Sequence, residues 1–224
     1  MRERILCIGD VHAPFVSKPT VSKIFALIEE IKPTIIVQLG DAYDFYSFSH
    51  FPRSMNLMTP SQEIADGRCV MEEIWGAINR RAKKAKKYQL LGNHDDRVTK
   101  RLREKFPELE SLVDLSKIWK FDGVTTINDS REELEIEGII FQHGYRSKLG
   151  DHMRFNHRST VVGHSHRGGV ALQPIGGKLL FELNAGYIAD PFHPALVYRQ
   201  QLKFFNWTHG VGFIDHLGPR FIPL

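Results

Sequence analysis

Three short apolar segments, each ending in glycine and then aspartate or asparagine, constrain the fold of this chain more than any other feature. They read RILCIGD at residues 4–10, TIIVQLGD at residues 34–41 and KYQLLGNHD at residues 87–95. Short apolar runs bounded by turn residues are typical of strands that are buried on both faces. Each predicted strand therefore ends at a turn that carries a polar side chain.

The stretches between these strands have helical spacing. Residues 18–31 carry apolar side chains three or four positions apart, at Val21, Ile24, Phe25, Ile28 and Ile31. Lys32 and Pro33 predict the end of that helix, and a second helical stretch covers roughly residues 61–84. Strands that alternate with helices predict parallel βαβ units.

Strand patterns dominate the second half of the chain. After a short helical region at residues 109–119, predicted strands cover residues 133–144, 159–166, 178–186 and 195–207. The sequence contains no linker or internal repeat, so we expect a single domain spanning residues 1–224. The expected fold class is α/β, as a four-layer α/β/β/α sandwich of two mixed sheets with outer helices.

The composition is that of an ordinary soluble globular protein, with 42% hydrophobic and 25% charged residues. A domain of this size buries enough surface to fold without a disulfide or a structural metal. Its two cysteines, Cys7 and Cys69, form neither a disulfide framework nor a zinc-ligand spacing. The first apolar run is too short for a signal peptide and no segment approaches a membrane span. We therefore expect a cytoplasmic protein that does not contact a membrane.

Positive charge is unevenly distributed, although the net charge is only +4. The run NRRAKKAKKY at residues 79–88 contains no acid, and the basic segment RVTKRLREK follows at residues 97–105. Such segments attract phosphates or nucleic acid, but they also occur as solvated helix faces. Charge alone does not decide between these two interpretations.

Polar side chains with metal-binding chemistry gather where the predicted strands end. Ligands in open α/β sheets bind beyond the carboxyl ends of the strands, so we expect these side chains to converge there. Carboxylates and imidazoles without thiolates suit Mn²⁺, Fe, Zn²⁺ or Ni²⁺. The residues are Asp10 and His12 in GDVH, Asp41 and Asp44 in GDAYD, Asn93, His94 and Asp95 in GNHDD, His143 in QHG, and His164 and His166 in GHSH.

This order of five motifs resembles the calcineurin-like metallophosphoesterase family. The resemblance implies two divalent metal ions, most readily Mn²⁺, and hydrolysis of phosphate esters by direct attack of a hydroxide that bridges them. It implies that Asp41 bridges the two metals. One metal would be held by Asp10, His12 and His166, and the other by Asn93, His143 and His164.

The resemblance also assigns roles beside the metals. His94 would act near the leaving group as a general acid or charge stabiliser, because an imidazole supplies a proton near neutral pH. Asp44 would orient His94, or would cap a turn. Asp95 is expected to accept hydrogen bonds from loop amides. Arg97 and Asn93 are candidates for binding the substrate phosphate, although Arg97 also fits a helix surface.

One departure from the family pattern narrows the substrate. Relatives that act on phosphoproteins carry Arg-Gly after the second aspartate of the second motif, whereas this chain has Phe45 and Tyr46. We therefore favour a phosphodiester slightly over a monoester, on a phosphorylated small molecule, a nucleotide or a nucleic acid. The aromatic loop, with Phe45, Tyr46, Phe48 and Phe51, either stacks on a base or packs against itself. The alternatives are a nuclease or nucleic-acid end-processing phosphatase that uses the basic helix, and a non-catalytic scaffold of the same fold. The oligomeric state is not determined by the sequence.

Overall fold

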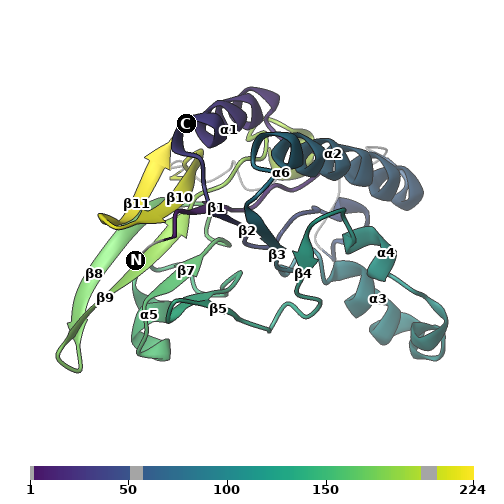
Figure 1. The fold of residues 1–224 in the computed structure, drawn as a ribbon. Helices are drawn as coiled ribbons and strands as arrows, with labels where there is room; N and C mark the ends of the chain where they lie inside the picture. The colour runs from purple at the N-terminus through teal and green to yellow at the C-terminus, as the bar shows by residue number, and fades with distance from the viewer. Residues whose placement is uncertain (1–2, 51–57, 198–205) are drawn as a thin grey trace.

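The computed structural model describes residues 3–50, 58–197 and 206–224, and its architecture is two β-sheets packed face to face (Figure 1). The six-stranded first sheet has the order β11-β10-β1-β2-β3-β4. Strands β1 to β4 are parallel, whereas β10 and β11 are antiparallel to their neighbours. The strands are β1 (Ile5–Ile8), β2 (Ile35–Gln38), β3 (Lys86–Gln89), β4 (Thr125–Thr126), β10 (Gly210–Asp215) and β11 (Gly218–Pro223).

The second sheet has five strands in the order β5-β6-β7-β9-β8. Strands β6, β7 and β9 are parallel, and an antiparallel strand lies at each edge. Both sheets are therefore mixed, as expected. The strands are β5 (Leu134–Ile136), β6 (Ile139–Phe141), β7 (Thr160–Val162), β8 (Gly168–Ile175) and β9 (Lys178–Ala185).

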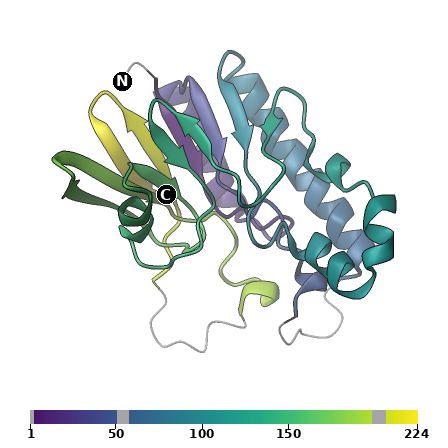
Figure 2. The ribbon, with the colours of Figure 1, turned by 90° about the horizontal axis from the view of Figure 1, so that it is seen from below.

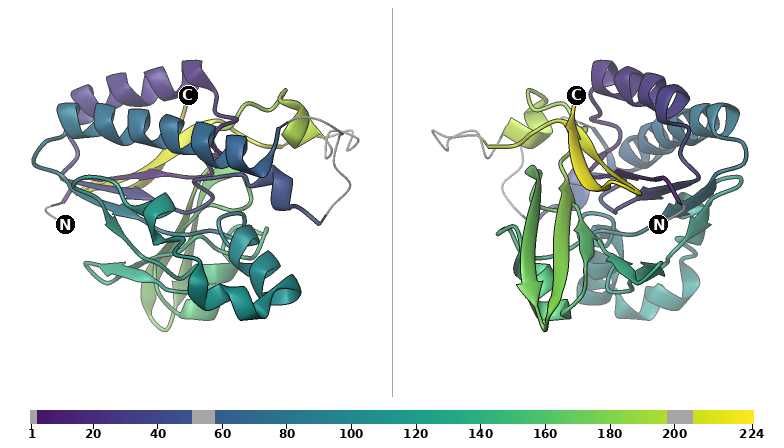
Figure 3. Two further views of the ribbon diagram at one scale, coloured as in Figure 1. Left: turned by 90° about the vertical axis from the view of Figure 1, so that its right-hand side faces the viewer. Right: turned by 60° about the vertical axis from the view of Figure 1, so that its left-hand side comes forward.

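Helices complete the four layers. Helices α1 (Lys18–Ile31) and α2 (Pro60–Arg81) lie side by side on the outer face of the first sheet (Figure 3), and α5 (Asp151–Asn156) packs on the second sheet through β7 and β9. Figures 1 and 2 place the β8–β9 hairpin and α3 at opposite sides of the molecule. The remaining elements are α3 (Arg97–Lys105), α4 (Ser116–Trp119), α6 (Pro194–Val197) and the 3₁₀ turns η1 (Tyr46–Phe48) and η2 (Pro107–Leu112).

Alternation along β1 explains why the first sheet is buried on both faces. Ile5 and Cys7 face the second sheet, where they pack with Phe141 and Leu183. Leu6 faces the helical layer and belongs to the core that α1 and α2 cover. Because successive side chains of a strand point to opposite faces, a continuous apolar run supplies both cores.

The predicted helix at residues 18–31 matches α1 residue for residue, and the first three predicted strands are parallel as expected. Helix α2 ends at Arg81 rather than near residue 84, and Lys86 and Lys87 belong to β3. The predicted strand at residues 195–207 is wrong where it begins, because α6 covers Pro194–Val197, and residues 198–205 lie outside the described part. Strands β4, β8, β10 and β11 were not predicted.

Within the described residues, no helix has both the length and the apolar character that crossing a bilayer requires.

Candidate metal centre

All seven side chains that the sequence predicts as metal ligands converge at the carboxyl ends of the parallel strands. Asp10, Asp41 and Asn93 follow β1, β2 and β3 of the first sheet, and the three histidines His143, His164 and His166 follow β6 and β7 of the second. The site therefore lies beyond the carboxyl ends of the parallel strands of both sheets. This is the position that open α/β sheets use for ligands.

The first group of donor atoms comes from Asp10, His12 and His166. Their ligand atoms all lie within 4.8 Å of one another. His166 Nε2 is 3.1 Å from His12 Nε2 and 3.4 Å from Asp10 Oδ1. The other ring nitrogen of His166, Nδ1, is buried and has no hydrogen-bond partner among the described residues. The three side chains thus present Nε2, Nε2 and a carboxylate to one point.

The second group is centred on Asn93. Its Oδ1 lies 2.8 Å from His164 Nδ1 and 3.0 Å from His143 Nε2. The other nitrogen of His143 makes a 2.9 Å hydrogen bond with Leu39 O, which fixes the orientation of the ring. A backbone carbonyl partner of this kind is typical of a metal-ligating histidine.

Asp41 lies between the two groups. Its Oδ2 is 3.9 Å from His12 Nε2 on one side and 3.3 Å from His143 Nε2 on the other. Its Oδ1 accepts a hydrogen bond from the backbone N–H of His94 at 2.8 Å. One carboxylate oxygen thus faces both sets of donors, while the other is held by the loop that carries Asn93.

Asp44 contacts two histidines, of which the sequence predicted only one. Its Oδ1 lies 2.9 Å from His94 Nδ1 and also 2.9 Å from His12 Nδ1. Burial alone would raise the pKa of Asp44, but the charges of His94 and His12 and their hydrogen bonds hold that pKa well below its usual range. Asp44 therefore links the candidate acid to a candidate ligand.

Five of the candidate ligands adopt left-handed backbone conformations, which the sequence pattern did not predict. A left-handed non-glycine residue costs about 1–3 kcal/mol and persists where the surrounding structure requires it. Such turns directly after the strands aim the side chains inward. The five φ angles are 42° at Asp10, 51° at His12, 51° at Asp41, 66° at His164 and 59° at His166.

The glycines that precede the motif residues serve mainly to leave space for neighbouring groups. Of the four glycines preceding the motif residues, Gly40 has a positive φ, of 92°. A Cβ at Gly163 would lie 2.6 Å from Asp10 Oδ2, and one at Gly92 would overlap the Asp41 carboxylate. At Gly9, it would lie 2.6 Å from the carbonyl oxygen of Gly186. The carboxylates therefore pack directly against neighbouring backbone.

Asp95 and Arg97 lie beside this centre. Asp95 accepts hydrogen bonds from the backbone amides of Ala42, Tyr43 and Gly92 at 2.8–3.2 Å, the geometry expected of a loop acceptor. The Arg97 guanidinium donates to the backbone oxygen of Asp44 at 2.8 Å and lies 3.0 Å from His94 Nε2. Arg97 is thus next to the candidate acid rather than on a solvated helix face.

Residues after position 184 support the site, although no sequence motif predicts this role for them. Tyr187 stacks on the His166 ring at 5.2 Å, and Trp207 meets that ring edge-on at 4.2 Å. The backbone N–H of Ile188 donates to Asp10 O, and that of Thr208 donates to His166 O. Only contacts across the fold reveal these roles.

The donor set fits divalent cations in its chemistry and its protonation. Burial lowers the pKa of His164 to about 4 and also lowers that of His12, which favours the neutral imidazoles that metals bind. At His143, burial is opposed by the Asp41 carboxylate, which raises the pKa to about 9. The proton on His143 therefore balances the charge of the Asp41 carboxylate, which a bound cation would balance in its place.

The aromatic loop is part of the core. Phe45 is fully buried and Tyr46 nearly so, and Phe45 packs between Tyr43 and Trp119. Neither ring is available to stack on a base, so for them the packing interpretation holds. Phe51 lies outside the described residues.

The two basic segments lie in different places. The run at residues 79–88 is split between the last turn of α2, a turn and β3. The run begins about 24 Å along α2 from Glu63, which lies in the first turn and binds the amides of Tyr46 and Ser47 near the site. The second segment forms α3, which begins at Arg97 beside His94.

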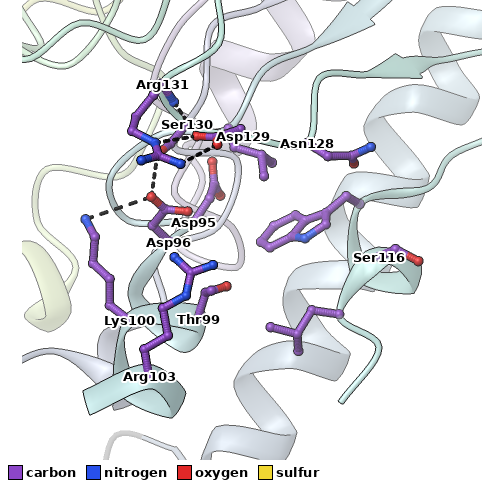
Figure 4. A pocket seen from close by; sticks show the side chains of 13 residues that line it. Asp95, Asp96, Thr99, Lys100, Arg103, Ser116, Asn128, Asp129, Ser130 and Arg131 are labelled. Atoms are coloured by element: carbon purple, nitrogen blue, oxygen red, sulfur yellow. Dashed lines mark hydrogen bonds and ion pairs between the residues drawn. The ribbon is translucent and has the colours of Figure 1, made fainter. Parts of the chain in front are cut away.

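A cavity of about 490 Å³ lies along α3 (Figure 4). Two of its cations are paired with acids, because Lys100 lies 3.9 Å from Asp96 and Arg131 lies 2.7 Å from Asp129. Pairing of this kind reduces the attraction that the cavity offers to a phosphate group. The cavity therefore offers less free positive charge than its number of basic residues suggests.

A family model described as calcineurin-like phosphoesterase matches residues 3–167. Two curated relatives, each named "Gene 54 protein", align with the whole of this chain and with 94% of their own length. The one from Mycobacterium phage L5 is 23% identical over 266 residues, and the one from Mycobacterium phage D29 is 26% identical over 267.

Among solved structures, the chain is similar to YfcE, a phosphoesterase from E. coli, with 16% identity, a TM-score of 0.42 and coverage of 95% of this chain and 88% of that one. It is also similar to Vps29 from Entamoeba histolytica, with 13% identity, a TM-score of 0.45 and coverage of 99% and 98%.

Proposed function

This chain belongs to the calcineurin-like phosphoesterase family, and from that premise we propose that it is a metal-dependent hydrolase of phosphate esters with a binuclear centre. The observation that carries the proposal is the position of Asp41 Oδ2, between His12 Nε2 at 3.9 Å and His143 Nε2 at 3.3 Å. Two cations a few ångströms apart repel each other, and a shared carboxylate offsets that repulsion. Asp41 has the position that such sharing requires.

The ligands divide into two sets around Asp41. Asp10, His12 and His166 would hold one cation. The other cation would be held by Asn93 Oδ1, His143 Nε2 and His164 Nδ1. Oxygen and imidazole donors suit Mn²⁺, with Fe, Zn²⁺ and Ni²⁺ as alternatives. When bound, such cations would acidify a water molecule and neutralise the charge of the phosphate.

His94 is proposed to protonate the leaving oxygen. Burial lowers the pKa of His94, but the Asp41 and Asp44 carboxylates more than offset this and raise it, which favours the protonated form of a general acid. Asp44 accepts from Nδ1 and leaves Nε2 to face Arg97 at 3.0 Å. A guanidinium cannot accept a hydrogen bond, so protonation of Nε2 would turn Arg97 away. The released guanidinium would then be available to the substrate phosphate.

A phosphodiester is the favoured substrate. Phe45 and Tyr46 occupy the positions where phosphoprotein-directed relatives carry Arg-Gly, and both are buried. The position therefore offers no cation to the second charge of a monoester. The proposed substrates are phosphorylated small molecules, nucleotides or nucleic acids.

The decisive experiment compares a p-nitrophenyl monoester, a p-nitrophenyl diester, a cyclic nucleotide and a single-stranded oligonucleotide in the presence of Mn²⁺. We expect turnover of at least one ester, fastest for a diester, with about two metal ions bound per chain. A metal-loaded protein that hydrolyses none of the four would refute the proposal and leave a non-catalytic scaffold.

The role of His94 is tested by varying the leaving group. A general acid matters most when the leaving oxygen is basic, so His94→Ala should lower turnover of an alkyl ester by about 10²–10⁴-fold and that of a p-nitrophenyl ester much less. His216→Ala is the matched control, because His216 is exposed at the opposite end of the first sheet. Equal losses for the two esters would remove the general-acid role.

A nuclease is a second candidate, because the basic helix α3 begins at the site with Arg97. It predicts that affinity for single-stranded DNA or RNA falls steeply as salt rises. Affinity that is indifferent to salt would exclude this candidate. The run at residues 79–88 does not support it, because that run lies far along α2 from the site.

A further inference from the structure

A second cavity, of about 370 Å³, opens beside the candidate second cation position. Its lining includes Asn93 and His143 of the second ligand set, together with Glu133, Gln142, Tyr145 and Phe155. We call this cavity, defined by these six residues, the α5 pocket, because Phe155 is on α5. Its volume is at the small end of the range for sites that bind small molecules. The cavity therefore has room for a group attached to a phosphate that lies at Asn93 and His143.

Two exposed aromatic rings form one side of the α5 pocket. The side chains of Tyr145 and Phe155 are 57% and 64% exposed, and the Arg146 guanidinium carbon lies 5.0 Å and 5.2 Å from their ring centres. Aromatic rings are surfaces on which flat bases stack, and Arg146 holds these two rings together from outside the pocket lining. This wall is also anchored, because the backbone amides of Tyr145 and Arg146 donate to Nε2 of the buried His152 at 3.1 Å and 3.2 Å.

An unpaired buried donor forms another side. Gln142 is only 8% exposed, and its Nε2 has no hydrogen-bond partner among the described residues. Phe141, the preceding residue on β6, faces the core between the sheets, so Gln142 points the other way, toward α5. A buried N–H without a partner is costly, and a ligand that supplies an acceptor relieves the cost. Glu133, which is exposed on the rim, offers an acceptor in return.

We propose that the α5 pocket binds the nucleobase of a nucleotide ester whose phosphate lies at the metal centre. Stacking surfaces, a donor at Gln142 and an acceptor at Glu133 together match a flat heterocycle that has both acceptors and donors. An alkyl or sugar group lacks the π-face that the rings favour. This inference rests on the proposed function, since it places the phosphate at Asn93 and His143.

The test uses two diesters with the same leaving group. One is the p-nitrophenyl ester of thymidine 5′-phosphate and the other is methyl p-nitrophenyl phosphate, which has no base. Stacking on one aromatic side chain changes affinity by about tenfold or more. Phe155→Ala should therefore lower the ratio of kcat/KM for the thymidine ester to that for the methyl ester by about tenfold. Leu179→Ala, which truncates an equally exposed apolar residue on the β8–β9 hairpin, should leave the ratio unchanged.

Gln142→Leu separates recognition from structure. Removal of a donor that pairs with the base should lower the same ratio by about tenfold. The melting temperature should stay the same or rise, because the variant removes an unsatisfied buried amide. If Gln142 were instead a structural residue, the melting temperature would fall and the ratio would not change.

The outcomes for the pocket and for the proposed function are distinct. A wild-type protein that hydrolyses both esters, with a ratio that neither variant alters, overturns the pocket but leaves the phosphoesterase proposal intact. If neither ester is hydrolysed, calorimetry compares binding of adenosine monophosphate and ribose 5-phosphate. A preference for the nucleotide that Phe155→Ala abolishes supports the pocket, and equal binding or none overturns it.

Competition distinguishes a free nucleotide from a strand end. Adenosine monophosphate and a deoxyadenylate decamer are compared as inhibitors of methyl ester hydrolysis. If Phe155→Ala weakens inhibition by either compound about tenfold, the result supports binding of a base in the pocket. The compound that inhibits the wild-type protein more tightly shows whether the base comes from a free nucleotide or from a strand end. Inhibition by both that is independent of Phe155 contradicts the proposal.

Discussion

Substitution of Gly163 by alanine tests how tightly the candidate ligands are packed. The new Cβ would lie 2.6 Å from Asp10 Oδ2, whereas ordinary contacts begin near 3.4 Å, so the carboxylate must retreat by about 0.8 Å. Asp10 is fully buried and accepts the backbone N–H of His164 at 3.0–3.1 Å. Displacement of Asp10 therefore also disturbs His164, which directly follows Gly163 in the chain.

The expected loss follows from that displacement. A misplacement of about 1 Å in a catalytic constellation costs roughly 100-fold in rate. We expect kcat/KM of Gly163→Ala for a p-nitrophenyl diester to fall about 100-fold, and the Mn²⁺ concentration that gives half-maximal activity to rise. The crowding should lower the free energy of unfolding by about 1–3 kcal/mol, and the protein should still fold.

Gly76→Ala is the matched control. Gly76 lies inside α2, where a Cβ would have Arg80 Nη1 at 3.5 Å as its nearest neighbour. Alanine should raise the free energy of unfolding by about 0.5–1 kcal/mol and leave the kinetics unchanged. Steady-state kinetics over a Mn²⁺ titration and urea denaturation measure both variants. The reasoning fails if Gly163→Ala keeps turnover within twofold of wild type and an unaltered Mn²⁺ requirement.

Three further predictions concern the metals, Asp44 and the support beneath the α5 pocket. Chelation with EDTA should abolish turnover and added Mn²⁺ should restore it, so activity that survives exhaustive chelation contradicts a metal-dependent reaction. Asp44→Asn should lower kcat about 100-fold and weaken Mn²⁺ binding by about 10–100-fold, because Asp44 holds both His94 and His12; an effect on kcat alone would separate Asp44 from the metals. Burial opposes ionisation of Glu182, but hydrogen bonds from His152 and Met153 hold its pKa below the ordinary 4.5. The ionised group therefore stabilises the fold above that pH and loses this effect as pH falls through the lowered pKa. The stability deficit of Glu182→Gln in urea denaturation should be largest near pH 7 and shrink below pH 4.5, and a constant deficit would show that charge plays no part.

The sequence alone determined the parts of this protein that local pattern encodes. Apolar runs located the parallel strands β1 and β2, and helical spacing located α1 to its last residue, whereas the run at residues 87–95 overlaps β3 only at residues 87–89. The polar residues after each strand identified the candidate ligands, because the carboxyl ends of parallel strands lie side by side and bring those residues together. These signals lie within a few residues of one another, so no knowledge of distant contacts is needed to interpret them.

Tertiary structure alone decided the features that depend on distant neighbours. The sequence left open whether Phe45 stacks on a base or packs within the protein, and only the structure shows that Tyr43 and Trp119 enclose it. Gly163 reads as a turn residue, yet the Asp10 carboxylate, remote in sequence, occupies the space of its missing side chain. Trp207 belongs to no motif and still packs against His166. Periodicity records which face of an element is apolar, whereas the partner of that face, and the space left for a side chain, arise only when separate segments of the chain meet.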